Sequence, residues 1–252
     1  MVITSVSNPH IRYVRTLASD KRAREADGVI VLEGANLIDA LPVGAEVAEL
    51  LVQEGKADKY CGIIERFGNY IEVSDNVMRA VSSVNTPQGI VAAAKFTLPE
   101  ADRLKPAVIA DGITDPGNMG TIIRSAAACG IYDLIAIECC DLTAPKTVRS
   151  TMGGIFSMRV SYVDRASVAK ELSGYKVFAL DMRGENIYNI SKRELDCAYA
   201  LAVGSEAHGI SDGIRAAAYK IVSLPMSGAT ESLNAAVSLS VGLYQLVYGN
   251  KI

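Results

Sequence analysis

Residues that could act on a polar substrate gather in three short segments of the second half of the chain. The first segment runs from Asn118 to Arg124 and has the pattern Asn-x-Gly-x-x-x-Arg. A strand is expected to end just before it and a helix to begin, because Asp115 or Thr114 can cap the helix and Pro116 suits its first turn. A guanidinium at such a place could orient a hydroxyl group, hold a phosphate or stabilise a developing oxyanion.

Arg124 lies off the apolar stripe that we expect on this helix. The helix is predicted over 119–129, with Gly130 after its end. The expected stripe consists of Met119, Ile122, Ile123 and Ala126. The neighbours of Arg124 one turn away are all small, namely Gly120, Thr121, Ala127 and Ala128. A bulky polymer therefore has room to approach the guanidinium, although helix position alone favours a solvated surface arginine.

The second segment, Val203-Gly-Ser-Glu-Ala-His-Gly209, follows a buried strand. Gly204 ends that strand, and a glycine there lets backbone come close to a ligand. Glu206 could serve a binding site or simply interact with free N–H groups at a helix start. A hydrolase built on Ser205, Glu206 and His208 is disfavoured, because these residues are too close in sequence to form a triad and Gly-x-Ser-x-Gly is absent.

The third segment consists of Leu224-Pro-Met226 and Ser232-Leu-Asn234. Ser232 is expected to cap the last helix, roughly residues 232–248, with Asn234 in its first turn. By local pattern alone, a helix cap surrounded by core residues is the favoured interpretation.

Composition limits the class of protein. The chain has 252 residues, of which 50% are hydrophobic, and suits one large domain or two modest ones. Its net charge of −3 counts mildly against a nucleic-acid binder, which would need a local basic patch. The five cysteines include no Cys-x-x-Cys pair, and we find no signal peptide or membrane-length apolar run. These features favour a soluble protein of the cytoplasm.

The chain divides into two alternating α/β regions, 1–96 and 107–252, joined by a proline-containing linker over 97–106. Strands are expected in the first region at Val29–Leu32, Glu49–Val52, Tyr70–Val73 and Gly89–Ala94. In the second they are expected at Ala107–Ala110, Leu134–Ile137, Lys176–Leu180, Ala200–Val203 and Lys220–Leu224. The second set lacks polar alternation, which predicts a buried, mostly parallel sheet.

Taken together and in this order, the three segments resemble the motifs of the SpoU (TrmH-type) branch of the SPOUT RNA methyltransferases. The resemblance implies an S-adenosylmethionine-dependent RNA 2′-O-ribose methyltransferase that works as a homodimer without a metal. It also implies a deep trefoil knot, which general topology rules would not predict. A Rossmann cofactor site is not supported, because no strand is followed by Gly-x-Gly-x-x-Gly.

The resemblance assigns roles to individual residues. Catalytic roles fall to Asn118, Arg124, Glu206 and Asn234. Cofactor contacts fall to Gly204, Leu224, Met226, Ser232 and Leu233. In the family the arginine lies beside the ribose 2′-hydroxyl and is proposed to help deprotonate it. Because a guanidinium normally keeps its proton, Arg124 could instead orient the hydroxyl or stabilise the alkoxide.

The first region is similar to the L7Ae/L30e-like substrate-binding domain of family members that act on ribosomal RNA. The similarity rests on Asn8-Pro-His-Ile-Arg12, Leu32-Glu-Gly34 and Thr86-Pro-Gln-Gly89. Phosphate contacts are predicted for Arg12, Arg15, Lys21, Arg22, Arg24, Lys146 and Arg149. For Lys146 and Arg149 a solvated helix face is the alternative.

The expected substrate is therefore ribosomal RNA of the 23S type. A tRNA 2′-O-methyltransferase and a non-catalytic RNA-binding module of the same fold are the alternatives. The presence of Asn118, Arg124, Glu206 and Asn234 argues against the non-catalytic module. The sequence leaves open which nucleotide is modified and whether the role is housekeeping or antibiotic resistance.

Overall fold

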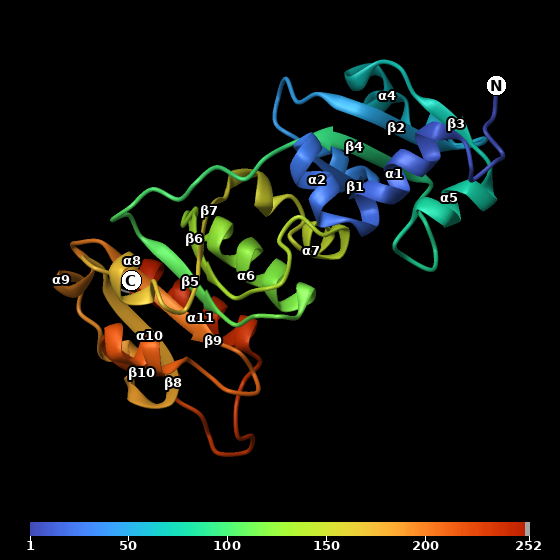
Figure 1. The fold of residues 1–252 in the computed structure, drawn as a ribbon. Helices are drawn as coiled ribbons and strands as arrows, with labels where there is room; N and C mark the ends of the chain where they lie inside the picture. The colour runs from blue at the N-terminus through green and yellow to red at the C-terminus, as the bar shows by residue number, and fades with distance from the viewer. Residues whose placement is uncertain (250–252) are drawn as a thin grey trace. The chain divides into compact units, whose positions relative to one another are not determined.

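The computed structural model describes residues 1–249 and divides into two compact units (Figure 1). Unit 1 contains residues 1–97 together with Asp141–Phe156, and unit 2 contains residues 98–140 together with the chain from Ser157 onward. Sixteen residues from the second half of the sequence (141–156) thus fold with the first half. The domain boundaries at 96 and 107 stay a prediction. Within the described residues, no helix is long and apolar enough to cross a membrane.

Unit 1 is a four-stranded sheet with helices. Its elements are α1 (Pro9–Ser19), α2 (Lys21–Asp27), β1 (Val29–Glu33), α3 (Ala35–Asp39), β2 (Val47–Gln53), η1 (Asp58–Tyr60), α4 (Cys61–Phe67), β3 (Ile71–Val73), α5 (Asp75–Val81), β4 (Ile90–Lys95) and α7 (Pro145–Ser150). The short 3-10 helix η2 (Gly154–Ser157) ends at the border of the units.

The sheet of unit 1 has the strand order β1-β4-β2-β3. The pairs β1–β4 and β2–β4 are antiparallel, and β2–β3 is parallel. The amphipathic helix α1 buries Ile11, Val14 and Leu17, which pack with α5 against one face of the sheet. The basic residues of α1 are consequently on its solvent side.

Unit 2 is built on a six-stranded sheet. Its elements are β5 (Ala107–Asp111), α6 (Pro116–Ala128), β6 (Asp133–Ile137), β7 (Arg159–Val163), α8 (Val168–Glu171), β8 (Lys176–Asn186), η3 (Ile187–Asn189), α9 (Lys192–Leu195), β9 (Tyr199–Gly204), α10 (Asp212–Ala217), β10 (Ala218–Ser223) and α11 (Ala235–Tyr248). The strand order is β10-β8-β9-β5-β6-β7, and every neighbouring pair is parallel. The predicted α/β class with a parallel sheet is confirmed.

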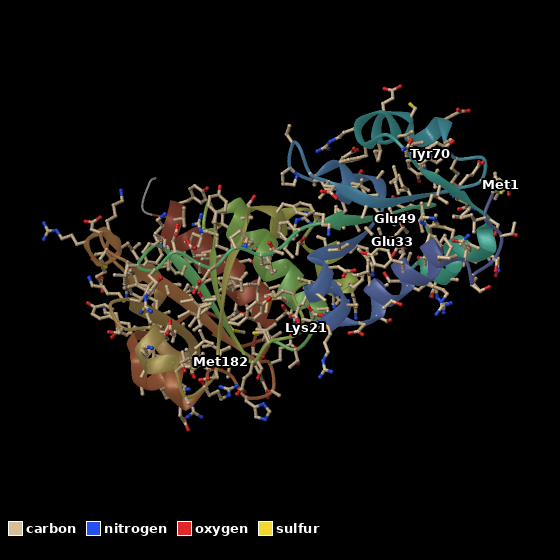
Figure 2. All side chains as sticks on the ribbon, turned by 45° about the horizontal axis from the view of Figure 1, so that its top comes forward. Met1, Lys21, Glu33, Glu49, Tyr70 and Met182 are labelled. Atoms are coloured by element: carbon tan, nitrogen blue, oxygen red, sulfur yellow. The ribbon has the colours of Figure 1, made fainter. Side chains whose placement is uncertain are left out.

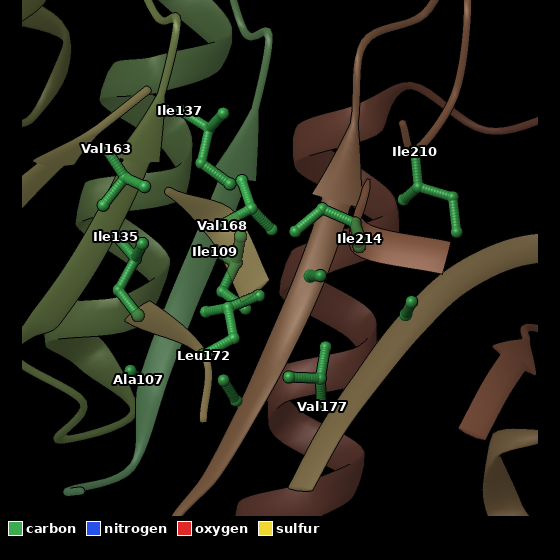
Figure 3. Packing of buried hydrophobic residues seen from close by; sticks show 13 residues of the cluster. Ala107, Ile109, Ile135, Ile137, Val163, Val168, Leu172, Val177, Ile210 and Ile214 are labelled. Atoms are coloured by element: carbon green, nitrogen blue, oxygen red, sulfur yellow. The ribbon is translucent and has the colours of Figure 1, made fainter. Parts of the chain in front are cut away.

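Both faces of this sheet are buried, as its continuous apolar strands require. On one face, Ile109, Ile135 and Val177 pack with α8 and α10 (Figure 3). On the other, α6 lies against α11, which also packs on β9. The expected stripe of α6 is confirmed, since Met119, Ile122, Ile123 and Ala126 are all buried.

Two expectations about unit 2 are corrected. The strand β7 lies at the sheet edge and was not predicted. The last helix begins at Ala235, and its cap is Asn234 rather than Ser232. The amide oxygen of Asn234 accepts the N–H groups of Ala236 and Val237, so the helix starts two residues later than Ser232 would have placed it.

Candidate active site

The structure brings the three sequence motifs together through hydrogen bonds among Asn118, Glu206 and Asn234. Asn118 Nδ2 donates to Glu206 Oε1 at 3.1 Å, and Asn234 Nδ2 donates to the same oxygen at 2.5 Å. Asn234 Nδ2 also lies 3.0 Å from Asn118 Oδ1, which accepts from it. One carboxylate oxygen therefore fixes the amide groups of two helices.

Asn118 and Asn234 are each held at the start of a helix. Asp115 caps α6, as predicted, and its Oδ1 accepts the N–H of Asn118 at 2.8 Å. Asn234 uses its oxygen to cap α11 and its nitrogen to bond the cluster. Since both helix starts carry unpaired N–H groups, the carboxylate of Glu206 also lies where the helix dipoles favour negative charge.

Glu206 is carried by a tight turn after β9. The backbone N–H of Gly209 donates to the carbonyl of Ser205 at 2.8 Å, which closes the turn. A Cβ on Gly204 would lie 1.9 Å from the carbonyl carbon and oxygen of Gly209. The close backbone approach expected at Gly204 is therefore present, but the approaching backbone belongs to the chain itself.

A cavity of about 880 Å³ opens beside this turn. All five predicted cofactor residues line it, namely Gly204, Leu224, Met226, Ser232 and Leu233. Glu206 lines it as well, while Asn118 and Asn234 do not. Its walls combine apolar side chains with serine hydroxyls and charged groups, a set that suits a nucleoside joined to a charged tail. The residues present thus fit S-adenosylmethionine.

The cavity also has a charged part that the sequence did not reveal. Asp181, Arg183 and Arg215 line it, and Arg215 Nη2 donates to Asp181 Oδ2 at 2.7 Å. The hydrogen bond from Arg215 lowers the pKa of Asp181, helped by the backbone N–H of Arg183. Asp181 is on β8 and Arg215 on α10, so only the fold brings them together, and no local pattern could have marked them.

Arg124 does not join this cluster within one chain. Its side chain is exposed on α6, outside the lining of the cavity, and it forms no ion pair within residues 1–249. It lies six positions after Asn118, which on an α-helix is about 9 Å along the axis and about 120° around it. Four of the predicted catalytic residues are therefore split into a bonded group of three and a separate arginine.

The predicted phosphate contacts lie in unit 1. Arg12, Arg15 and Arg22 on α1 and α2 and Lys146 on α7 are exposed, and none forms an ion pair within the described part of the chain. Lys21 is also exposed (Figure 2). It pairs with Glu25 at 3.5 Å, one helical turn away.

Arg24 and Arg149 have different surroundings from those expected. Arg24 is only 4% exposed; it pairs with Asp141, and its Nη1 donates to the carbonyl of Leu17 at 2.6 Å. Its guanidinium thus joins α2 to the 141–156 segment instead of facing solvent. Arg149 Nη1 lies 3.2 Å from Glu33 Oε2, a buried carboxylate at the end of β1. The prediction that Arg24 contacts RNA phosphates is therefore corrected, because its guanidinium is buried against Asp141.

Comparisons with known proteins match both units. Residues 105–244 match the SpoU rRNA Methylase family, and residues 8–92 match the MRM3-like substrate binding domain. The chain is 28% identical to the 23S rRNA (guanosine(2553)-2'-O)-methyltransferase RlmP of Bacillus subtilis (strain 168), covering 97% of this chain and 98% of that protein. It is 30% identical to the 23S rRNA (uridine(2479)-2'-O)-methyltransferase of Streptomyces viridochromogenes, covering 69% and 64%.

Solved structures agree. A crystal structure of an RNA 2'-O ribose methyltransferase is similar with a TM-score of 0.84 and 28% identity, covering 100% of both chains. The SpoU methyltransferase AviRb from Streptomyces viridochromogenes, in complex with AdoMet, is similar with a TM-score of 0.80 and 26% identity, covering 97% of this chain and 98% of that one.

The parallel sheet, the cavity and the substrate-binding unit define a methyltransferase of the SPOUT class. Within that class, the chain belongs to the SpoU rRNA Methylase family.

Proposed function

We propose that this protein transfers the methyl group of S-adenosylmethionine to the 2′-hydroxyl of a ribose in ribosomal RNA. The observation that carries the proposal is the Asn118–Glu206–Asn234 cluster, which joins three motifs beside a cavity with the lining that the cofactor requires. The similar proteins named above as 23S rRNA 2'-O-methyltransferases, and the AdoMet complex of AviRb, support the same reaction.

The residues of the chain divide the chemical work. S-adenosylmethionine, when bound, supplies a methyl group already activated by its positively charged sulfur. Leu224, Met226 and Leu233 line the cavity and would hold the adenosine part of the cofactor through apolar contacts. Glu206 locks the two asparagine amides, so the polar groups at the reaction centre are oriented in advance. Arg124 orients the ribose hydroxyl and stabilises the negative charge that develops on its oxygen, and the hydroxyl proton leaves to solvent water.

Unit 1 is proposed to bind the RNA backbone. Arg12, Arg15, Arg22 and Lys146 present positive charge to solvent, and phosphate contacts of this kind supply most of the affinity for a polyanion. The match of residues 8–92 to the MRM3-like substrate binding domain supports this role and favours ribosomal RNA over tRNA.

A homodimer is part of the proposal. Val237, Val241, Tyr244 and Tyr248 are exposed along one side of α11, spaced by three and four residues. A stripe of large apolar side chains at this spacing is typical of a helix that packs against another helix. Arg124 is absent from the cavity of its own chain, so a second copy is the source we propose for the arginine at each site.

A cytoplasmic location is also proposed. Cys61, Cys129, Cys139, Cys140 and Cys197 all lie within residues 1–249 and form no disulfide there. This is the state expected of cysteines in a reducing compartment.

The test is transfer of labelled methyl from S-adenosylmethionine to purified ribosomal RNA and, in parallel, to tRNA. Wild type should label ribosomal RNA, and the label should survive alkali in a dinucleotide because a 2′-O-methyl group blocks cleavage. Arg124→Ala should lower the rate on the order of 100-fold, the usual effect of losing a group that stabilises a developing oxyanion. Arg193→Ala, which removes an exposed arginine of α9 outside the cavity, is the matched control and should remain active.

Label on tRNA alone would overturn the choice of substrate while keeping the reaction. No label on either RNA, or full activity in Arg124→Ala, would contradict the proposed function.

A further inference from the structure

Charged side chains form a continuous series of hydrogen bonds along the carboxyl edge of the sheet in unit 2. Across this edge the strands run in the order β9-β5-β6-β7. Arg165 follows β7, Glu138 follows β6, and Asp111 is the last residue of β5. Arg165 Nε donates to Glu138 Oε2 at 2.6 Å, and Arg165 Nη1 donates to Asp111 Oδ1 at 2.9 Å. One guanidinium thus spans the ends of three strands.

This series of hydrogen bonds ends at the turn that carries Glu206. The second oxygen of Asp111, Oδ2, accepts the backbone N–H of Ser211 at 2.6 Å. Ser211 comes two residues after Gly209, where the turn closes. The turn is therefore fixed at one end by strand β9 and at the other by the carboxylate of Asp111.

Burying the carboxylate of Asp111 costs desolvation free energy that a neutral residue would avoid. Its side chain is only 1% exposed, and a buried carboxylate is strongly unfavourable unless both oxygens are paired. Glu138, which holds the same guanidinium, has a φ of +47°, a left-handed conformation that is unfavourable for a residue with a side chain. Gly112 at +69° leaves room for Arg165, because a Cβ there would lie 3.3 Å from Nη2.

We propose that Asp111 is a positioning residue for the cofactor-binding turn 204–211, and that Arg165 holds Asp111 in place for this task. This inference rests on the proposed function, since it concerns the same cavity. Gly204, Ser205, Glu206 and Gly209 line that cavity, so a displacement of the Ser211 end would move the walls of the cofactor site. The effect acts through the turn, because Asp111 itself is outside the lining.

The same sheet contains a matched control at its opposite, amino edge. Asp133 starts β6 and Arg159 starts β7. Arg159 Nε and Nη2 donate to the two oxygens of Asp133 at 2.8 and 2.6 Å, and Asp133 is also only 1% exposed. This pair is likewise a buried aspartate bonded to an arginine, here through two hydrogen bonds, but it holds the backbone N–H of Asp102 instead of the turn.

The experiment measures the dissociation constant of S-adenosylmethionine by calorimetry for wild type, Asp111→Asn and Asp133→Asn. The KM for cofactor and the KM for ribosomal RNA are measured alongside. Asp111→Asn should raise the dissociation constant and the cofactor KM about tenfold, as expected when a charged hydrogen bond is lost, with the RNA KM unchanged. Both variants should lower the melting temperature to a similar extent. Asp133→Asn, however, should leave cofactor affinity at the wild-type value.

Ser211→Pro provides an independent variant if Asp111→Asn fails to fold. It removes the N–H that Asp111 accepts, and the φ of −69° at Ser211 already suits proline. It should weaken cofactor binding in the same way. Arg165→Lys keeps the positive charge but cannot donate to Glu138 and Asp111 with the geometry of a guanidinium, so it should give an intermediate effect.

Wild-type affinity in both Asp111→Asn and Ser211→Pro would overturn the inference, and so would an equal loss of affinity in Asp133→Asn. A wild-type protein that binds no S-adenosylmethionine would instead overturn the proposed function, and the inference with it.

Discussion

The absence of a side chain at Gly204 directly constrains the site. The carbonyl of Gly209 and the N–H of Ile210 lie 1.9 and 2.2 Å from the position that a Cβ would occupy. Both are backbone atoms, so no side-chain rotation can relieve the clash. The turn that carries Glu206 thus depends on the absence of a single methyl group.

Gly204→Ala should destabilise the protein and impair cofactor binding. Forcing a methyl group into a packed site costs about 1–3 kcal/mol, and here the displaced atoms belong to the turn itself. Thermal unfolding and calorimetry with S-adenosylmethionine would measure both effects. Gly213→Ala on α10 is the control: its Cβ would meet only Val168 and Ser211 at ordinary contact distances, so stability should stay the same or rise by up to about 1 kcal/mol. Equal stability of Gly204→Ala and wild type would contradict this account.

At the residue scale, the sequence predicted which residues line the cavity but not which charged side chains form ion pairs with one another. Every residue predicted to contact the cofactor lines the cavity, because strand ends and helix starts meet at one edge of a parallel sheet. Arg24 was misjudged because its carboxylate partner, Asp141, is 117 residues away, and charge patterning records only neighbours in sequence. The same limit hid Asp181 and Arg215, whose ion pair joins two elements.

At the element scale, the start of α11 combines two tasks in one side chain. Asn234 Oδ1 caps the helix, and Asn234 Nδ2 bonds Glu206 and Asn118. Substitutions can separate the tasks, because serine caps a helix about as well as asparagine but lacks the amide nitrogen.

Asn234→Ser should therefore leave the free energy of unfolding within about 0.5 kcal/mol of wild type, while Asn234→Ala should lose about 1 kcal/mol. Methyl transfer should fall on the order of 100-fold in both, because the polar groups at the reaction centre lose their fixed orientation. Chemical denaturation and single-turnover rates would measure the two quantities. Full activity in Asn234→Ser would show that the amide serves only as a cap.

The elements themselves were predictable where burial imposes a pattern. The five strands predicted in the second region are continuous apolar runs, and each overlaps a strand of the structure. Strand β7, Arg159-Val-Ser-Tyr-Val163, escaped prediction because it lies at the sheet edge and alternates buried with more exposed residues. Ser232 was taken for the cap because serine is a good capping residue, whereas the bonds of Asn234 decide where the helix begins.

At the scale of the whole molecule, the proposed dimer makes each site composite. In a symmetric dimer, the arginine of one copy would serve the cavity of the other, so two defective chains could repair each other. Co-expression of Arg124→Ala with Glu206→Gln should restore about a quarter of wild-type activity, since half of the dimers are mixed and each has one intact site. Either variant alone should keep only about 1% of wild-type activity.

The readouts are methyl transfer by the mixed sample and its mass by light scattering. Val241→Glu, which places a charge on the exposed side of α11, should give monomers with little activity. No recovery in the mixed sample, with dimers present, would mean that each chain supplies its own arginine.

The long-range topology could not be predicted from the sequence. The trefoil knot was expected only from the family resemblance and stays a prediction. The placement of residues 141–156 in unit 1 could not be foreseen either, because nothing in their composition separates them from the strands before and after them.

That placement has a consequence for how the protein is made. The chain passes from one unit to the other three times, after residues 97, 140 and 156. Domains generally fold as their residues leave the ribosome, the N-terminal part first. Here the first 97 residues emerge without Asp141 or α7, so the guanidinium of Arg24 has no counter-charge and β1 lacks one of its covering helices. Synthesis must therefore reach well past the middle of the chain before its N-terminal part can take its final form.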